Sequence, residues 1–261
     1  MEGYKTILFS TAEGAATITL NRPNVFNSFN EQLATEVKAA LTVCQEDEAI
    51  RAIVLTGAGK AFCAGQDLQE ITGDDAPSLS TILSERLNPL VLLIREIEKP
   101  IIAAVNGVAA GAGANIALAC DVTIATQSAS FIQAFSKVGL IPDSGGTFFL
   151  PRLIGQQRAM GLMMTGEKIS AEDAERMGMI YKSFSDGVFH KEVNDFAQRI
   201  ARMPTKALGL TKRALNYSFE NTLERQLAIE DNLQAEASLT EDFQEGVAAF
   251  VEKRHPVFSG K

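Results

Sequence analysis

The stretch from Ile101 to Ala119, IIAAVNGVAAGAGANIALA, restricts the fold more than any other part of the chain. Its length and apolar character would suit a membrane-spanning helix, which needs about 20 mostly apolar residues. Its internal pattern does not, because Pro100 precedes it and Asn106, Asn115 and three glycines interrupt it. The pattern predicts that this segment changes structure twice along its length, and no membrane contact is expected.

Three consecutive elements fit this segment. Ile101 to Val105 predicts a buried strand, Gly107 to Gly113 a tight connection, and Asn115 to Ala119 a helix. Comparable patterns occur on either side of it. They comprise strands over Ala16 to Leu20 and Ala52 to Thr56, a helix capped by Asn30, a mobile loop over Ile71 to Ser80, a helix over Ile82 to Ile97 and a short helix over Ser144 to Leu153. This alternation is typical of an α/β fold.

The chain becomes mainly helical beyond Ser170, where the sequence Ser-Ala-Glu-Asp resembles a capping box. Glycine is sparse there, and charged residues alternate along the expected helix faces. The expected helices run over Asp186 to Met203, Lys206 to Phe219, Thr222 to Ala235 and Thr240 to Lys253. We therefore expect a helical C-terminal portion packed on an α/β core.

Composition argues against several classes of function. The 261 residues include 32 acidic and 24 basic side chains, and the net charge of −8 disfavours a nucleic-acid partner. The three cysteines are scattered without CxxC spacing, so reduced thiols and a cytoplasmic location are expected. The two distant histidines supply neither a Ser-His-Asp triad nor a metal site, and no metal is expected. Met1 to Leu20 lacks the pattern of a secretory signal.

Two glycine-containing segments are candidates for a binding site. One is AFCAGQDL, from Ala61 to Leu68, and the other is NGVAAGAGAN, from Asn106 to Asn115. Each follows an expected buried strand, so its small residues can bring backbone N–H groups close to a ligand. The second segment also opens a helix, whose positive end favours negative charge. Together they predict an oxyanion hole, although tight packing of strand on helix explains each segment alone equally well.

Asp143 lies in the segment GLIPDSGGT and has two interpretations. Its carboxylate can stand as a base at the mouth of a pocket lined by Phe131, Phe135 and Leu140. Alternatively, it can cap a helix that begins near Ser144. The residues alone favour the cap.

These segments together resemble the crotonase superfamily of enoyl-CoA hydratases and isomerases, over about Thr6 to Lys261. The likeness rests on AFCAGQDL, KPIIAAVNGVAAGAGANIALACD and FSKVGLIPDSGGTFFLPRLIG, which occur in the order and at the spacing of that family. The ending EGVAAFVEKRHPVFSGK is similar to a subgroup that converts ring-1,2-epoxyphenylacetyl-CoA into oxepin-CoA during phenylacetate degradation.

The resemblance implies an α/β fold, a crotonase-like spiral of ββα turns with a helical C-terminal trimerisation region. The spiral core, with the CoA-thioester site, is expected over residues 1–200 and the helical region over residues 201–261. A homotrimer or a dimer of trimers is implied. The ligand is an acyl-CoA or aryl-CoA thioester, and no cofactor is expected because coenzyme A is part of the substrate.

The resemblance also assigns roles to individual positions. The backbone N–H groups of Gln66 and Ala112 are the implied oxyanion-hole donors, and Asp143 is the implied acid and base. The implied substrate-binding residues are Val25, Ala64, Gly65, Asp67, Leu68, Gly111, Gly113, Asn115, Phe135 and Leu140, with Phe250 and Lys253 contributed by a neighbouring subunit.

Two departures from the family pattern decide which reaction is expected. Hydratases of the family use two glutamates to activate water, whereas the matching positions here hold Asn115 and Phe135. Asp143 stands where isomerases and dehalogenases of the family place a functional aspartate, which reverses the preference for a helix cap. An acyl-CoA isomerase, acting on the aromatic epoxide or on 3-enoyl-CoA, is therefore expected. A dehalogenase-like hydrolase with a nucleophilic aspartate, or a non-catalytic protein that binds CoA or RNA, remains an alternative.

Overall fold

Two sheets form the centre of the computed structural model, which describes residues 3–72 and 76–261. The larger sheet has the order β1-β2-β3-β5-β7-β10 and the smaller sheet has the order β4-β6-β8-β9. The strands are β1 (Ile7–Ala12), β2 (Ala15–Leu20), β3 (Ala52–Gly57), β4 (Ala61–Cys63), β5 (Ile101–Val105), β6 (Val108–Ala110), β7 (Val122–Thr126), β8 (Ser130–Ile132), β9 (Lys168–Ser170) and β10 (Lys182–Phe184).

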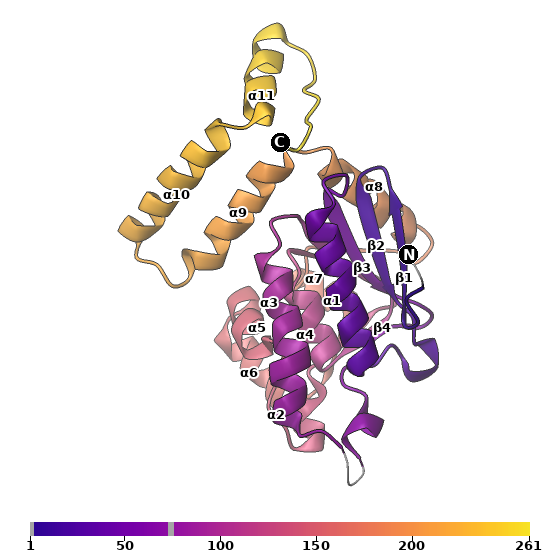
Figure 1. Cartoon of the computed structure of the whole chain (residues 1–261). Coiled ribbons are helices and arrows are strands. Elements are labelled where there is room, and N and C mark those ends of the chain that lie inside the picture. The colour runs from indigo at the N-terminus through magenta and orange to yellow at the C-terminus, as the bar shows by residue number, and fades with distance from the viewer. Residues whose placement is uncertain (1–2, 73–75) are drawn as a thin grey trace.

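The chain alternates between the two sheets and so forms a spiral (Figure 1). The pairs β3–β4, β5–β6 and β7–β8 each place one strand in each sheet, and a helical segment follows each pair. Neighbouring strands of successive turns are parallel, as this repeated crossover requires. The expected spiral of ββα turns is confirmed.

Helices cover the sheets and form the C-terminal part of the chain (Figure 1). The α-helices are α1 (Glu31–Glu46), α2 (Leu79–Ile82), α3 (Asn88–Glu96), α4 (Ala112–Ala119), α5 (Gly146–Ile154), α6 (Gln156–Thr165), α7 (Ala171–Arg176), α8 (Phe189–Ala201), α9 (Thr205–Ser218), α10 (Leu223–Ser238) and α11 (Glu241–Glu252). Shorter 3-10 turns lie at Pro23–Val25, Leu68–Ile71 and Ala134–Val138, and a π-helical turn at Leu83–Leu87 joins α2 to α3.

Helix α4 lies in the interior, and all eight of its residues are buried. A helix that is apolar on every side is stable only when surrounded by protein, which explains why this segment looked like a membrane span. The predicted strand over Ile101 to Val105 is confirmed as β5. The prediction of a connection over Gly107 to Gly113 is wrong, because Val108–Ala110 forms strand β6 between β4 and β8. The helix therefore begins at Ala112 rather than at Asn115.

Local signals located other helix boundaries correctly. The Asn30 side chain accepts a hydrogen bond from the Leu33 N–H at the start of α1, and Ser170 caps α7 in the same way. Part of the expected mobile loop, residues 73–75, lies outside the described residues. In its remainder, a 3-10 turn ends at Ile71 and helix α2 begins at Leu79.

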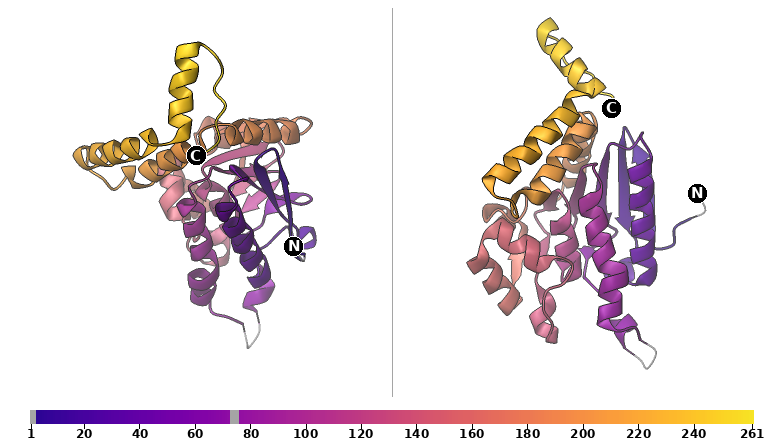
Figure 2. Two further views of the ribbon diagram at one scale, coloured as in Figure 1. Left: turned by 45° about the horizontal axis from the view of Figure 1, so that its top comes forward. Right: turned by 60° about the vertical axis from the view of Figure 1, so that its left-hand side comes forward.

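The four C-terminal helices α8 to α11 follow the expected order, and α10 and α11 extend away from the sheets (Figure 2). Helix α10 contains no buried residue in this single chain, whereas α8 buries one face on the larger sheet. Among the described residues, no helix combines the length and the apolar character required to cross a membrane.

Candidate active site

The two glycine-containing segments meet at Gly65 and Gly111. Both glycines have positive φ angles, +99° and +53°, which side-chain-bearing residues rarely adopt. A Cβ atom at Gly65 would lie 3.0 Å from the Ala110 carbonyl oxygen and 3.3 Å from the Ala112 nitrogen. Glycine is therefore needed at this position to let the two segments approach.

The Gln66 N–H is directed away from the segment around Phe29, with which Gln66 forms an isolated bridge. Phe29 forms a parallel bridge there, in which its N–H donates to the Gly65 oxygen at 2.7 Å and its oxygen accepts from the Asp67 N–H at 2.8 Å. Because backbone groups alternate sides along an extended segment, the Gln66 N–H between them points the other way. In the described residues it donates to no acceptor of the chain.

The Ala112 N–H is the first of helix α4. The first N–H groups of a helix have no partner within the helix, and the helix dipole adds partial positive charge there. Gly111 before it donates to the Ile132 oxygen at 2.9 Å, whereas the Ala112 N–H has no acceptor within the described chain. The structure thus leaves both predicted donors, at Gln66 and Ala112, available for an oxyanion.

Asp143 belongs to a loop that contacts the first turns of α4. Its carbonyl oxygen accepts a hydrogen bond of 2.8 Å from the Asn115 side chain. The interpretation of Asp143 as a helix cap is wrong, because α5 begins at Gly146 after a left-handed Gly145 and has no side-chain cap. The Asp143 carboxylate instead accepts a hydrogen bond of 2.8 Å from the Ser144 hydroxyl.

The surroundings of Asp143 suit a proton-transfer group. Burial raises the pKa of the Asp143 carboxyl above its ordinary value of 3.8, and the hydrogen bond from Ser144 opposes part of that rise. Phe135 is buried and its ring approaches within 3.7 Å of the place where a Gly111 Cβ would lie. An apolar ring thus lies beside Gly111, next to one of the two predicted oxyanion donors.

The raised pKa predicts that Asp143→Asn stabilises the fold near neutral pH. A carboxyl whose pKa is higher in the folded chain contributes stability below its unfolded pKa, and that contribution is lost as the pH rises through the folded pKa. At pH 7 the parent therefore carries an unfavourable buried charge that asparagine lacks. Thermal unfolding should show a higher Tm for the variant at pH 7 and a shrinking difference toward pH 4. A lower Tm for the variant at pH 7 would contradict the prediction.

Several predicted substrate-binding residues lie together near the first glycine segment. Val25 ends a 3-10 turn, and the Ala64 N–H donates to the neighbouring Phe26 oxygen at 3.0 Å. Leu68 is 54% exposed, so it is accessible to a ligand. Asp67 is different, because it is buried and its carboxylate forms an ion pair of 2.9 Å with Arg22.

Other predicted binding residues are enclosed by protein. Asn115 is fully buried, and both ends of its amide are hydrogen-bonded to protein groups. Gly113 packs against Cys63, where a Cβ atom would lie 2.3 Å from the Cys63 oxygen. Leu140 is not enclosed, because it is 39% exposed and lies at the surface three residues before Asp143.

Phe250 and Lys253 lie at the far end of the chain, on and just after α11, away from α4 (Figure 1). Phe250 is 85% exposed, and Lys253 ends the helix in a left-handed conformation. The single chain therefore does not bring them to its own glycine segments.

Sequence reasoning missed the side chains that hold the first donor segment. The Gln66 side chain donates to Glu70 at 3.1 Å, and Glu70 pairs with Arg86 at 3.0 Å. Arg22 holds the next residue, Asp67. The two arginines are distant in sequence from the carboxylates that they pair with, and no local motif marks them, so these ion pairs become apparent only in the folded chain.

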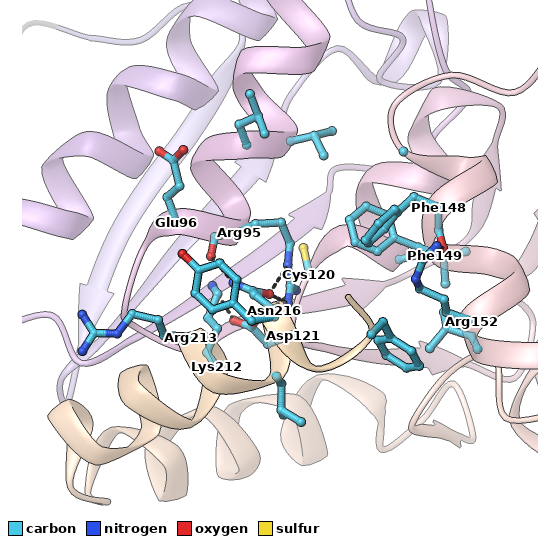
Figure 3. Close-up of a pocket in the computed structure, with 18 of the residues that line it drawn as sticks. Arg95, Glu96, Cys120, Asp121, Phe148, Phe149, Arg152, Lys212, Arg213 and Asn216 are labelled. Atoms are coloured by element: carbon cyan, nitrogen blue, oxygen red, sulfur yellow. Dashed lines mark hydrogen bonds and ion pairs between the residues drawn. The ribbon is translucent and has the colours of Figure 1, made fainter. Parts of the chain in front are cut away.

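A separate cavity of about 730 Å³ lies between α3, α5 and α9 (Figure 3). Asp121 lines it and accepts hydrogen bonds from Arg95 at 3.1 Å and from Lys212 at 2.8 Å. Lys212 is buried, and burial lowers its pKa even though Asp121 opposes the change. Breaking such a buried pair is strongly destabilising. We therefore infer that this network holds α9 against the core. Gln66, Ala112 and Asp143 are not among the residues that line the cavity.

Comparison with known proteins agrees with this geometry. The family model described as enoyl-CoA hydratase/isomerase matches residues 10–261. The chain is 48% identical over 261 residues to a probable enoyl-CoA hydratase of Rhodobacter capsulatus, covering 99% of each chain. It is 46% identical over 258 residues to the 1,2-epoxyphenylacetyl-CoA isomerase of Escherichia coli, covering 98% of each.

A solved structure shows the same fold. The crystal structure of an enoyl-CoA hydratase from Bacillus anthracis superimposes with a TM-score of 0.94 at 35% sequence identity, covering 98% of this chain and 100% of that one. The match of nearly the whole chain to the family model and to these relatives leaves one assignment. The chain belongs to the enoyl-CoA hydratase/isomerase family, the crotonase superfamily.

Proposed function

We propose that this protein is an acyl-CoA isomerase that uses the N–H groups of Gln66 and Ala112 as an oxyanion hole and Asp143 as its acid and base. The observation that carries the proposal is that two backbone N–H groups with no acceptor among the described residues accompany a loop that contacts α4 and holds a half-buried carboxyl of raised pKa. Family membership supports a CoA thioester as the substrate. The similarity to the 1,2-epoxyphenylacetyl-CoA isomerase supports isomerisation.

The proposed chemistry begins at the thioester carbonyl. Loss of a proton from the carbon next to this carbonyl places negative charge on its oxygen, and two preorganised N–H donors stabilise that charge more than they stabilise the ground state. Asp143 accepts the proton as the C–H bond breaks. For a 3-enoyl-CoA it returns the proton to C4, and the double bond then lies between C2 and C3. Water is not consumed, so one carboxyl is sufficient.

The residues at positions 115 and 135 favour isomerisation over hydration. Adding water to a double bond requires groups that orient and deprotonate a water molecule. Asn115 has both amide ends engaged by protein, and Phe135 offers only an aromatic ring. For the aromatic epoxide, we infer that the same donors and Asp143 move a proton of the acyl side chain and so assist its rearrangement to the oxepin.

The oligomeric assembly is part of the proposal. Exposed apolar side chains on α10 and α11 support association with further copies of the chain, as a homotrimer or a dimer of trimers. They are Leu223, Leu227, Phe243, Val247, Phe250 and Val251. In such an assembly Phe250 and Lys253 of one subunit would contact a thioester bound to its neighbour.

Turnover of three substrates tests the proposed function. We expect the purified protein to isomerise 3-hexenoyl-CoA, ring-1,2-epoxyphenylacetyl-CoA or both, and to hydrate crotonyl-CoA only weakly. Isomerisation in deuterated water should place solvent deuterium in the product unless the proton transfer is fully internal. Rapid hydration of crotonyl-CoA would overturn the isomerase assignment. Trapping of an ester on Asp143 with a halobenzoyl-CoA would indicate the dehalogenase-like alternative, and binding without turnover of any thioester would indicate a non-catalytic protein.

A further inference from the structure

A chain of buried amide groups connects α4 to the loop that carries Asp143. The Gln133 side-chain amide donates to the Asn115 side-chain oxygen at 2.8 Å. The Asn115 side-chain nitrogen donates in turn to the Asp143 carbonyl oxygen at 2.8 Å. Asn115 is fully buried and Gln133 is 3% exposed. Buried polar groups are costly unless they are hydrogen-bonded, so this arrangement holds its members in fixed positions.

The same amide chain is tied to the second oxyanion donor. Asn115 lies in the first turn of α4, which begins with Ala112, and its own N–H bonds to the Gly111 oxygen at 3.2 Å. The Ile132 oxygen, next to Gln133, accepts from the Gly111 N–H at 2.9 Å. Two adjacent residues, Ile132 as acceptor and Gln133 as donor, therefore connect the end of β8 to the beginning of α4.

The loop from Asp143 to Gly146 fits closely around the Asn115 amide. A Cβ atom at Gly146 would lie 2.3 Å from the Asn115 side-chain nitrogen, so only glycine leaves room for it. The Gly146 N–H donates to the same Asp143 oxygen at 2.9 Å. The neighbouring Ser144 is buried and has a positive φ of 50°, a strained conformation for a residue with a side chain. The loop therefore needs specific partners to keep this shape.

One polar atom in this set of linked amides has no hydrogen-bond partner in the part of the chain that the structure describes. The Gln133 side-chain oxygen is buried and has no hydrogen-bond partner within the described residues. An unsatisfied buried acceptor typically costs about 1–3 kcal/mol. The nitrogen of the same amide supplies the hydrogen bond to the buried Asn115 oxygen, so the fold keeps this amide for its donor while its oxygen stays unpaired among these residues.

We propose that Asn115 and Gln133 are positioning residues that fix Asp143 relative to the Ala112 N–H. The inference rests on the proposed function, because it assigns a role around the same base. An isomerase must remove a proton from one carbon and deliver it to another. The carboxyl therefore has to lie within reach of both carbons while the Ala112 N–H holds the thioester oxygen. A displacement of about 1 Å in such a group can cost 10²-fold in rate. The Asn115 amide acts through the backbone, because it holds the carbonyl oxygen of Asp143 and so fixes the loop from which the carboxyl extends.

Two substitutions test the positioning role. We expect Asn115→Leu to lower kcat by about 10- to 100-fold, and Gln133→Met by a smaller factor in the same direction. KM and the binding of a saturated thioester, hexanoyl-CoA, should stay near the parent values. The rising limb of the pH–rate profile should move to lower pH, because a loosened loop admits water to the Asp143 carboxyl.

Asn216→Leu is the matched control. The Asn216 amide is likewise hydrogen-bonded at both ends, to the guanidinium and the carbonyl oxygen of Arg95, but it lies on α9 beside the separate cavity. This variant should lower Tm and leave kcat and the pH profile unchanged. If Asn115→Leu does not fold, Gln133→Met still removes one hydrogen bond from the amide chain, and its kcat and pH profile decide the question.

The outcomes separate this inference from the proposed function. Parent values of kcat and of the pH profile in the folded variants, together with an inactive Asp143→Asn, would overturn the positioning role alone. Normal turnover by Asp143→Asn would overturn the base assignment and the positioning role together. A fall in Tm with unchanged kcat in both variants would show that the amides serve only stability, and would also reject the proposal.

Discussion

Asp143→Asn should lower the kcat for isomerisation by about 10² to 10⁴, the range that a positioned general acid–base group contributes. Asparagine keeps the size of the side chain and can still accept the hydrogen bond from Ser144, so the loop should keep its shape. It cannot accept a proton from carbon. Steady-state turnover of 3-hexenoyl-CoA, with hexanoyl-CoA binding measured in parallel, separates loss of chemistry from loss of binding.

Asp195→Asn provides the comparison for this variant. Asp195 lies on α8 and pairs with Lys191 at the surface, where losing a carboxylate should have little effect. Its kcat should equal that of the parent. Near-normal turnover by a folded Asp143→Asn would reject Asp143 as the base, whereas loss of hexanoyl-CoA binding would show that it serves recognition instead.

The second large effect is expected from Ala112→Pro, which deletes a backbone N–H. Ala112 is the first residue of α4, where proline is compatible with the helix because the N–H has no partner inside it. Removing one oxyanion donor typically lowers kcat by about 10² to 10³. The substitution should therefore reduce turnover by this factor while α4 and the fold are retained.

Ala112→Gly distinguishes the donor from the side chain. Proline keeps a Cβ and removes the N–H, whereas glycine lacks the methyl group and keeps the N–H, so turnover by the glycine variant should stay close to the parent rate. Circular dichroism and Tm establish that both variants are folded. Equal losses in the two variants would mean that the backbone conformation at position 112, and not its N–H, supports catalysis. Full activity in the folded proline variant would remove Ala112 from the oxyanion hole.

Local chemistry made much of this molecule predictable from its sequence. Asn30 and Ser170 marked helix starts because their side chains satisfy N–H groups a few residues away. The apolar run from Ile101 to Val105 matched a strand covered on both faces. The two glycine-containing segments were predicted to expose backbone N–H groups, because each has small residues directly after a strand.

Tertiary pairing decided what the sequence could not show. Val108–Ala110 was expected to be a connection, and it became a strand because β4 and β8 lie on either side of it. The position of Asp143 next to Ser144 and the glycines suggested a helix cap, yet the left-handed Gly145 delays the helix, and the carboxylate accepts a hydrogen bond from Ser144 instead of capping α5. The contacts of Asn115 with Gln133 and Asp143 join three segments, and no local pattern encodes them.

The proximity of the two proposed oxyanion donors follows from the pairing of β4 with β6. Cys63 and Ala109 are partners in that pairing, and Gln66 and Ala112 each come three residues later. Adjacent strands lie about 4.8 Å apart, so the segments that continue from them stay close, as the tight approach of Gly65 to Ala112 shows. Main-chain pairing, rather than any side chain, therefore brings the two proposed donors together. Substitutions of side chains such as Asp143 or Phe135 would leave that pairing in place.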